Sequence, residues 1–409
     1  MFIERFWGWL DKWGWLGLKM RTEQKKRRLL ITLGFPPAVG GMQQHLYQRC
    51  RAVYGGQITV LAPQTAGWRE FDAQQTFPIR RWSGFLGQTP VIKRFLQLIL
   101  PFFHTLALYH QQAFDWIECG QALPFGLIAL YFKKALGVPY LVWAYGSDIL
   151  KPQRYPFLKR LLHVILSNAD ALVAVSQSTK RKIVQLGLDP EKITVIHPSV
   201  DTRRFHSQND RSAVMARHHL QGKRVILTVA RLVERKGIDI VIQALTKVLE
   251  VIPEAVYLVV GTGPYKRKLE SLAEELGLER RVIFVGKVPD DELPCYYGAC
   301  DVFVLISRTL ADKGEMEGFG IVYLEAEACG KPVIAGRGGG ASEAVEDGVT
   351  GLLVDPSDVG EIANAIVRVL EDEELARRLG ENGRTRARQQ PDWALLEQEP
   401  ALREVSKPA

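Results

Sequence analysis

The chain has 409 residues, too many for one ordinary compact domain, so two domains are the first expectation. Hydrophobic residues make up 47% and charged residues 24%, which is typical of a globular protein and excludes disordered and fibrous classes. The net charge of +8 favours an anionic partner, such as a nucleotide diphosphate, a nucleic acid or acidic lipid headgroups.

The first 28 residues differ in composition from everything that follows. They contain four of the nine tryptophans and eight Lys or Arg against three Asp or Glu, ending in the run Lys25-Lys26-Arg27-Arg28. On a helical wheel the charged residues before position 20 share one arc, which predicts an interfacial helix on an anionic membrane surface. The alternatives are a helix packed on the protein itself, or an upstream extension of a chain that starts at Met20.

Apolar, β-branched runs then alternate with helical patterns, which predicts parallel strands buried on both faces of a sheet. The first series of expected strands covers residues 29–33, 58–62, 115–119, 140–144, 171–175 and 193–197. The second covers residues 225–230, 256–260, 282–285, 302–305, 332–335 and 352–354. The fold class is therefore α/β, with two doubly wound Rossmann-like domains that face a central cleft at the carboxyl ends of their strands.

The pattern pauses in a polar stretch, and this pause divides the chain. We expect an N-terminal segment at 1–28, a first domain at 29–205 for the acceptor, a linker at 206–223, a second domain at 224–385 for the donor nucleotide, and a tail at 386–409 that packs back on the first domain. The five cysteines form no C-x-x-C pair, which favours a reducing, cytoplasmic compartment.

Three segments carry candidate chemistry. The glycine-rich loop that ends in Gly40-Gly41 joins the first strand to a helical stretch, where backbone N–H groups bind phosphate, although a plain turn explains it equally well. Arg231 and Lys236 follow the first strand of the second domain and are placed to meet a diphosphate; an isolated R-x4-K is commonplace in solvated loops.

The third segment is the most specific. Glu317 and Glu325 bracket seven residues, and Gly318 and Gly320 between them open a helix whose first N–H groups are available to an anion. Glu325 lies two turns into that helix, where a carboxylate accepts both vicinal hydroxyls of a ribose.

Together these motifs resemble the family-4 retaining glycosyltransferases of GT-B fold, from about residue 28 to the end of the second domain. Gly261-Thr262-Gly263-Pro264 and Gly338-Gly339-Gly340 belong to the same resemblance. Within the family, residues 314–325 and 335–340 are most similar to the bacterial phosphatidylinositol mannosyltransferases.

The resemblance implies roles for individual residues. Arg231 and Lys236 would hold the β-phosphate, and Glu317 with the amides of Phe319 and Gly320 would contact the donor sugar and phosphates. The remaining donor contacts that it implies come from Gly41 at the diphosphate, Lys287 and Val288 at the base, Gly318 in the loop, and Glu325 at the ribose.

One position departs from the family pattern. Relatives carry a His-Gly-x-Asp/Glu segment after the fifth strand, whereas this chain has Tyr145-Gly146-Ser147-Asp148. A phenol can hydrogen-bond a sugar hydroxyl, but it cannot carry the positive charge of a protonated imidazole at neutral pH. Tyr145 is therefore a candidate contact to the donor sugar. Because it replaces the family's histidine, the donor or the acceptor can differ from that of the mannosyltransferases. The alternative is that Tyr145 is a buried structural residue whose hydroxyl is hydrogen-bonded within the protein.

No Asp-x-Asp occurs in the chain, so we expect no metal and no cofactor, with fixed charges stabilising the departing nucleotide. The expected reaction moves a hexose, mannose as the first guess, from a nucleotide-sugar donor to a glycolipid or glycan acceptor at the inner face of the cell membrane, with no nucleic-acid partner. A nucleotide-sugar epimerase, another hexosyltransferase with a soluble acceptor, and a catalytically silent membrane scaffold stay open. A nicotinamide dehydrogenase is disfavoured because G-x-G-x-x-G is missing from both halves.

Overall fold

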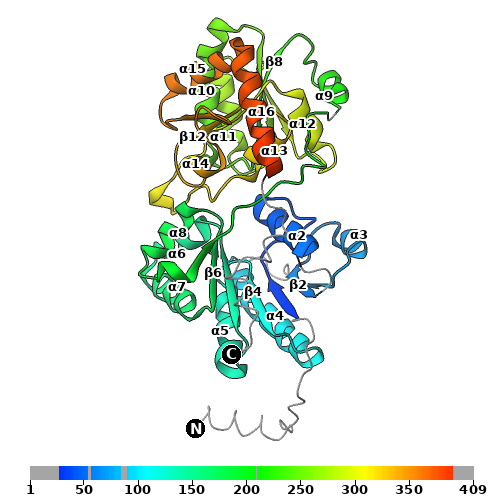
Figure 1. Ribbon diagram of the computed structural model, residues 1–409, viewed down its shortest axis with the longest axis vertical. Helices are drawn as coiled ribbons and strands as arrows, with labels where there is room; N and C mark the ends of the chain where they lie inside the picture. Colours follow the sequence, from blue (N-terminus) through cyan, green and yellow to red (C-terminus); the bar gives the residue numbers. More distant parts are fainter. Residues whose placement is uncertain (1–26, 54–56, 84–89, 209, 390–409) are drawn as a thin grey trace, which may run out of the picture.

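The computed structural model describes residues 27–53, 57–83, 90–208 and 210–389, which form two α/β domains stacked along the long axis of the molecule (Figure 1). The predicted interfacial helix and most of the predicted tail lie outside the described residues. None of the described helices is long and apolar enough to cross a membrane.

The first domain holds a parallel sheet in the order β3-β2-β1-β4-β5-β6-β7. Its strands are β1 (Arg28–Ile31), β2 (Ile58–Pro63), β3 (Ile79–Trp82), β4 (Trp116–Cys119), β5 (Tyr140–Ala144), β6 (Ala171–Ala174) and β7 (Ile193–Val195). Its helices are α2 (Gly41–Val53), α3 (Trp68–Ala73), α4 (Pro90–Gln111), α5 (Phe125–Leu136), α6 (Ser147–Gln153), α7 (Pro156–Asn168), α8 (Gln177–Val184) and the short η2 (Pro190–Lys192).

The second domain holds a parallel sheet in the order β10-β9-β8-β11-β12-β13. Its strands are β8 (Arg224–Val229), β9 (Ala255–Val260), β10 (Val282–Gly286), β11 (Val302–Leu305), β12 (Val333–Gly336) and β13 (Gly351–Val354). Its helices are α9 (Ser212–Arg217), η3 (Glu234–Lys236), α10 (Ile238–Val251), α11 (Lys266–Glu275), α12 (Leu293–Ala299), η4 (Ala311–Lys313), α13 (Ile321–Ala328), α14 (Ala341–Ala344), α15 (Val359–Glu371) and α16 (Glu373–Gln389).

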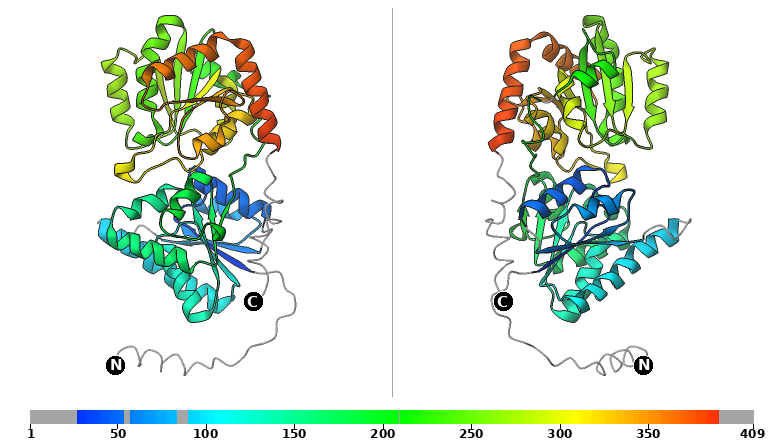
Figure 2. Two further views of the ribbon diagram at one scale, coloured as in Figure 1. Left: turned by 60° about the vertical axis from the view of Figure 1, so that its left-hand side comes forward. Right: turned by 90° about the vertical axis from the view of Figure 1, so that its right-hand side faces the viewer.

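The strands form where they do because their residues are apolar on both faces. Every residue of β5 and β9 is buried, as parallel sheets covered by helices on both sides require. In β8, Ile226 packs into one hydrophobic cluster while Val225 and Leu227 pack into another, so successive side chains serve opposite faces. Figure 2 shows helices on both sides of each sheet. The predicted fold class is confirmed.

The strand β3 was not predicted, and its composition explains why. Its sequence Ile-Arg-Arg-Trp carries two cations, and it lies at the edge of the sheet beside β2 alone. The Arg81 side chain is nevertheless buried, because its guanidinium donates to the Asp72 carboxylate, with Nε–Oδ2 at 3.0 Å and Nη2–Oδ1 at 2.7 Å, and to the carbonyl oxygens of Pro36 and Pro63. A buried guanidinium with these partners has no signature in hydrophobic periodicity.

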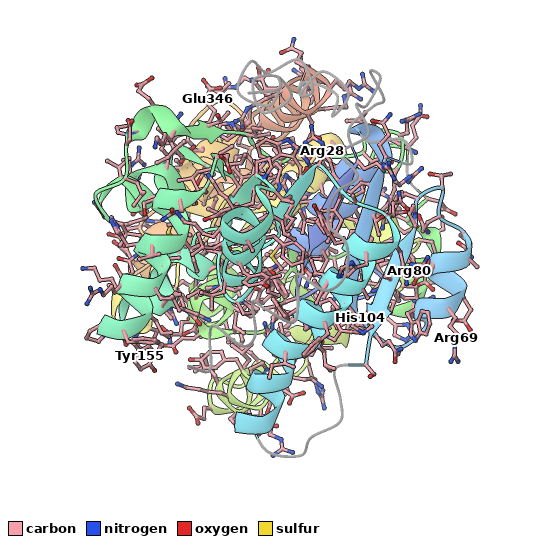
Figure 3. All side chains as sticks on the ribbon, turned by 90° about the horizontal axis from the view of Figure 1, so that it is seen from below. Arg28, Arg69, Arg80, His104, Tyr155 and Glu346 are labelled. Atoms are coloured by element: carbon pink, nitrogen blue, oxygen red, sulfur yellow. The ribbon has the colours of Figure 1, made fainter. Side chains whose placement is uncertain are left out.

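One predicted segment differs from expectation, and one long helix covers the first domain from below. The predicted linker 206–223 contains α9, which packs against α12 of the second domain. The apolar stretch 95–109 forms part of α4, which crosses the underside of the first domain (Figure 3). Pro101 and Thr105 of α4 are buried whereas His104 is exposed, so the described part of this helix covers the core with one face.

Candidate active site

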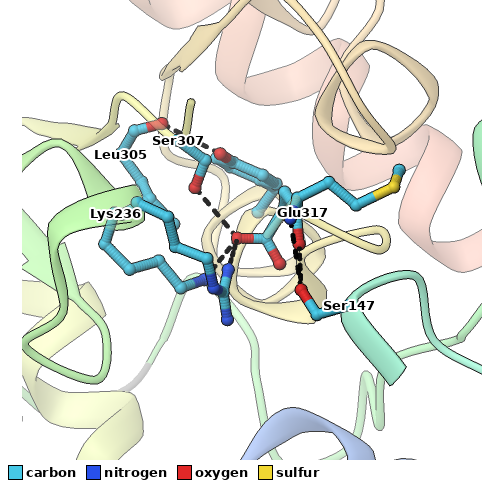
Figure 4. A network of polar contacts seen from close by, with 8 residues as sticks. Ser147, Lys236, Leu305, Ser307 and Glu317 are labelled. Atoms are coloured by element: carbon cyan, nitrogen blue, oxygen red, sulfur yellow. Dashed lines mark hydrogen bonds and ion pairs between the residues drawn. The ribbon is translucent and has the colours of Figure 1, made fainter. Parts of the chain in front are cut away.

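A charged cluster lies at the carboxyl ends of β8 and β11, around the carboxylate of Glu317 (Figure 4). Glu317 Oε2 accepts hydrogen bonds from Lys236 Nζ at 2.5 Å, Arg235 Nη1 at 3.0 Å and Ser307 Oγ at 2.9 Å. Lys236 and Glu317 are each 8% exposed. Two cations therefore share one carboxylate, which leaves the cluster with an excess positive charge beside the cleft.

Burial and ion pairing oppose each other in this cluster. Burial alone raises the pKa of Glu317, but Lys236, Arg235 and the hydrogen bonds from Lys236 and Ser307 lower it to about 2. Burial lowers the pKa of Lys236, and Glu317 counteracts that shift. Glu317 is consequently a carboxylate over the whole neutral range, so it can accept hydrogen bonds but cannot act as a proton donor.

The loop before α13 is built from glycines because the chain passes too close to itself for side chains. A Cβ on Gly318 would lie 2.1 Å from the carbonyl oxygen of Tyr145, and one on Gly340 would lie 2.0 Å from the carbonyl oxygen of Gly318. Gly320 has φ +93°, and its Cβ would meet the Tyr323 ring at 2.4 Å. The segment Gly318–Gly320 and the segment Gly338–Gly340, both part of the family resemblance, are thus in direct contact.

The first turns of two helices from different domains lie next to each other here. Helix α13 begins at Ile321 and no side chain caps its first N–H groups. Helix α2 begins at Gly41, and a Cβ there would lie 3.9 Å from the Ile321 side chain. Because a helix N-terminus carries partial positive charge, the two together suit an anion such as a diphosphate.

Tyr145 reaches this region from the end of β5, and its hydroxyl lies 2.8 Å from Nδ1 of His45 on α2. The two rings meet edge to face with centroids 5.5 Å apart. Burial, with a smaller effect of Arg49, lowers the pKa of His45 to about 3, so its imidazole is neutral. Sequence reasoning missed His45, although its place one turn after Gly41 on a predicted helix was the available signal.

Glu325 lies on α13 and is 8% exposed. Its Oε2 accepts a 2.7 Å hydrogen bond from the Tyr297 hydroxyl on α12. The carboxylate lines a small pocket between the domains, together with residues of α2 and of the segment that crosses to the second domain; these include His45, Gln48, Ser199, Asp201 and Phe205. Burial raises the pKa of Glu325, and the Tyr297 hydrogen bond opposes that rise.

Phe319 is 3% exposed, whereas three other predicted residues lie nearer the surface. Arg231 is exposed after β8, and no described residue pairs with its guanidinium. Lys287 is exposed and Val288 half-buried just beyond β10. Within the described part of the chain, no group of three or more His, Cys, Asp or Glu side chains has the arrangement of a metal site.

Hydrogen bonds and one ion pair join the two domains across the cleft. They involve side chains of α6, of α14 and of Glu315 in the loop before α13. Ser147 Oγ, at the start of α6, lies 3.0 Å from the carbonyl oxygen and 3.1 Å from the amide nitrogen of Met316 (Figure 4). Lys151 and Glu315 form a 2.7 Å ion pair beside it. Glu343 of α14 accepts hydrogen bonds from the amides of Gln177 at 2.6 Å and Ser178 at 2.7 Å, at the start of α8.

Comparison with known proteins places this geometry in a family. The model of the glycosyltransferase family 4 domain matches residues 39–204, and the model of the group 1 glycosyl transferases matches residues 210–386. A GDP-mannose-dependent α-(1-6)-phosphatidylinositol monomannoside mannosyltransferase of Mycolicibacterium smegmatis is 33% identical over 374 residues, covering 90% of this chain and 93% of the relative. The Mycobacterium tuberculosis enzyme of the same name is 32% identical over 378 residues, covering 90% and 96%.

Solved structures agree with the sequence relatives on the fold. The crystal structure of Anabaena HepE in complex with UDP and glucose has a TM-score of 0.80 at 25% identity, covering 94% of this chain and all of that one. Sucrose-phosphate synthase of Thermosynechococcus elongatus has a TM-score of 0.77 at 26% identity, covering 93% and 99%. With both halves of its cleft matched by these models and relatives, the chain belongs to the group 1 and family 4 glycosyltransferases of GT-B fold and is a glycosyltransferase.

Proposed function

We propose that this glycosyltransferase moves mannose from GDP-mannose to a lipid-linked acceptor, with retention of anomeric configuration. Its support is the likeness to GDP-mannose-dependent mannosyltransferases, which extends over 90% of the chain and so over both domains. The structural observation that supports glycosyl transfer is that the charged cluster of Lys236, Arg235 and Glu317 lies close to the first turns of α13 and α2.

In this proposal the nucleotide diphosphate lies between the two helix starts. Lys236 and Arg231 hold its β-phosphate, while the amides of Gly41, Phe319 and Gly320 donate hydrogen bonds to the phosphate oxygens. Glu325 accepts the ribose hydroxyls, and the backbone of Lys287 and Val288 contacts the base. Glu317 and Tyr145 face the donor sugar.

The proposed reaction breaks the bond from the anomeric carbon to the β-phosphate oxygen and forms one to an acceptor hydroxyl oxygen on the same face of the sugar. The proton of that hydroxyl passes to the departing phosphate. Charge builds up on the diphosphate as it leaves, and the two cations and two helix starts stabilise it without reorganising. We propose that these fixed groups suffice and that the reaction needs no metal or cofactor.

A second donor is favoured by one specific observation. The structure of HepE, at 25% identity over 94% of this chain, has been determined with UDP-glucose. The segment expected to contact the base includes exposed Lys287, and a backbone contact accommodates either base. UDP-glucose is therefore the alternative donor.

A donor panel distinguishes these possibilities. The full-length protein is incubated with GDP-mannose, UDP-glucose and related sugars, together with phosphatidylinositol vesicles, and lipid products are identified by mass spectrometry. We expect one hexose to be added from GDP-mannose. Hexose added only from UDP-glucose would favour the alternative, whereas an epimerised donor with no transfer would contradict glycosyl transfer to lipid.

We also propose that the enzyme acts as a peripheral protein at the inner face of the cell membrane, attached through residues 1–28. The support is the charge of +5 (eight Lys or Arg less three Asp or Glu) beside four tryptophans in this segment. In the same assay, a chain lacking residues 1–19 should lose transfer to acceptor in anionic vesicles but retain donor hydrolysis. Equal transfer by both chains would contradict the anchoring role.

A further inference from the structure

The Glu325 carboxylate accepts a hydrogen bond from Tyr297, a residue that belongs to no sequence motif. Tyr297, on α12, donates its hydroxyl to Glu325 Oε2 at 2.7 Å. The whole Tyr297 residue is buried, with 0% exposed. Glu325 reaches the pocket from α13, so the two residues come from different helices and are joined through their side chains.

The position of the Tyr297 hydroxyl is fixed by its ring. Phe205 meets that ring edge to face with centroids 5.7 Å apart, and Phe303 of β11 lies 5.6 Å from it. Burial and the neighbouring Glu325 raise the pKa of Tyr297 well above its ordinary value, so the phenol stays protonated and can only donate to the carboxylate.

We infer that Tyr297 is a positioning residue, whose hydroxyl holds Glu325 in the orientation in which the carboxylate accepts the ribose hydroxyls of a nucleoside diphosphate. A carboxylate has about four acceptor sites on its two oxygens, so one hydrogen bond to Oε2 leaves Oε1 with acceptor capacity for a ligand. This inference rests on the proposed function, because it takes the pocket at Glu325 as the ribose site.

The chain supplies a matched control at the adjacent position. Tyr296 is also on α12 and is 1% exposed. Its hydroxyl lies 3.2 Å from His218 Nε2 and 3.4 Å from Arg217 Nη1, both belonging to α9 or its end rather than to the pocket. Tyr296→Phe and Tyr297→Phe therefore remove the same atom from equally buried rings, and only the second change reaches Glu325.

The experiment compares binding of ribose and 2′-deoxyribose nucleotides. Dissociation constants for GDP and 2′-deoxy-GDP, and for UDP and 2′-deoxy-UDP, are measured by calorimetry with wild type, Tyr297→Phe and Tyr296→Phe. We expect wild type to prefer the ribose form by about tenfold, the scale of a hydrogen bond to a charged group. Tyr297→Phe should reduce that preference to about twofold, and Tyr296→Phe should keep it.

One further readout separates positioning from a merely structural role. Tyr297→Phe should raise KM for the donor several-fold with kcat little changed. If wild type prefers the ribose form and Tyr297→Phe prefers it equally, the inference fails while the proposed function stands. If wild type binds neither GDP nor UDP, the proposed function fails, and the inference with it.

Discussion

The Lys236 ammonium is buried 2.5 Å from the Glu317 carboxylate, with Arg235 as a second cation on the same oxygen. The Glu317 carboxylate fixes the position of the Lys236 ammonium group. It also opposes the effect of burial, which lowers the pKa of Lys236. In the proposed function, a diphosphate binds beside this cluster, where α2 and α13 begin.

We predict that Lys236→Ala lowers turnover at least about 100-fold, the scale of losing a charged group directed at a developing negative charge. The measurement is kcat with the preferred donor. Lys133→Ala is the control, since Lys133 pairs with Asp170 at the amino-terminal edge of the first sheet, away from the cleft. Near-normal turnover in a folded Lys236→Ala protein would contradict the role proposed for the cluster.

A second buried carboxylate on α13 gives a prediction about stability. Glu327 is 0% exposed, and burial raises its pKa from 4.5 to about 7, although Thr350 and Arg386 lower it somewhat. Between these two values the unfolded chain releases the proton while the folded chain keeps it. The stability that the protonated Glu327 contributes at low pH is therefore lost as pH rises from about 4.5 to 7.

Glu327→Gln removes this dependence. Relative to wild type, the variant should gain up to about 3 kcal/mol in free energy of unfolding between pH 5 and pH 7.5, at 1.4 kcal/mol for each pKa unit. Urea unfolding at the two pH values measures the difference, with exposed Glu381→Gln as control. A difference between variant and wild type that is the same at both pH values would contradict the assignment.

Sequence alone proposed Lys236, Glu317 and Glu325 as candidate site residues because glycines and charges at fixed spacing mark them, and the structure buries all three. It did not single out His45, Ser307 or Tyr297. Each of these contacts a candidate residue through one side-chain hydrogen bond, and apart from the place of His45 one turn after Gly41, a single His, Ser or Tyr carries no periodic or compositional signal.

At the scale of elements, the first backbone amides of α8 donate hydrogen bonds to a carboxylate of the second domain. Ser176 caps the amide of Thr179 from within the first domain, and Glu343 of α14 accepts the two amides before it. Glu343 also lies 3.2 Å from His197 Nε2. Burial raises the pKa of Glu343, but the hydrogen bonds from His197, Ser178 and Gln177 lower it overall, so this contact is made by a carboxylate.

We predict that Glu343→Gln loosens the contact between the domains, because the amide loses the charge that favours a helix N-terminus. Hydrogen exchange followed by mass spectrometry should show the amides of Gln177 and Ser178 exchanging about fivefold faster, equivalent to about 1 kcal/mol. The control is Glu361→Gln, whose carboxylate accepts the Asp355 amide within the second domain. Unchanged exchange at α8 would show that Glu343 does not hold the domains together.

The elements themselves followed from the sequence wherever strands were apolar throughout, as in β5 and β9. The departures have local causes. Edge strand β3 is half cationic, and α9 spans only six residues within a polar stretch predicted as a linker. The contacts between domains were beyond sequence reasoning, because Ser147 and Met316 lie 169 residues apart and the spacing within one segment does not predict a hydrogen bond to another domain.

At the scale of the whole molecule, the two sheets direct the carboxyl ends of their strands toward one cleft, and Figure 1 shows α2 and α13 approaching it from opposite domains. Neither domain contains the complete candidate site. Lys236, Glu317 and Glu325 belong to the second domain, whereas Gly41, His45 and Tyr145 belong to the first. In the proposed function, both domains therefore contact the donor, and their closure on it would exclude water from the reacting carbon.

Retaining transfer of mannose, supported by fixed charges at this cleft, is tested most directly by the stereochemistry of the product. GDP-mannose and a phosphatidylinositol acceptor are incubated with the full-length protein in the presence of EDTA, and the anomeric configuration of the new bond is read by NMR. We predict a product that keeps the donor's configuration at a rate unchanged by the chelator. An inverted product, or transfer abolished by EDTA and restored by a divalent cation, would contradict the account.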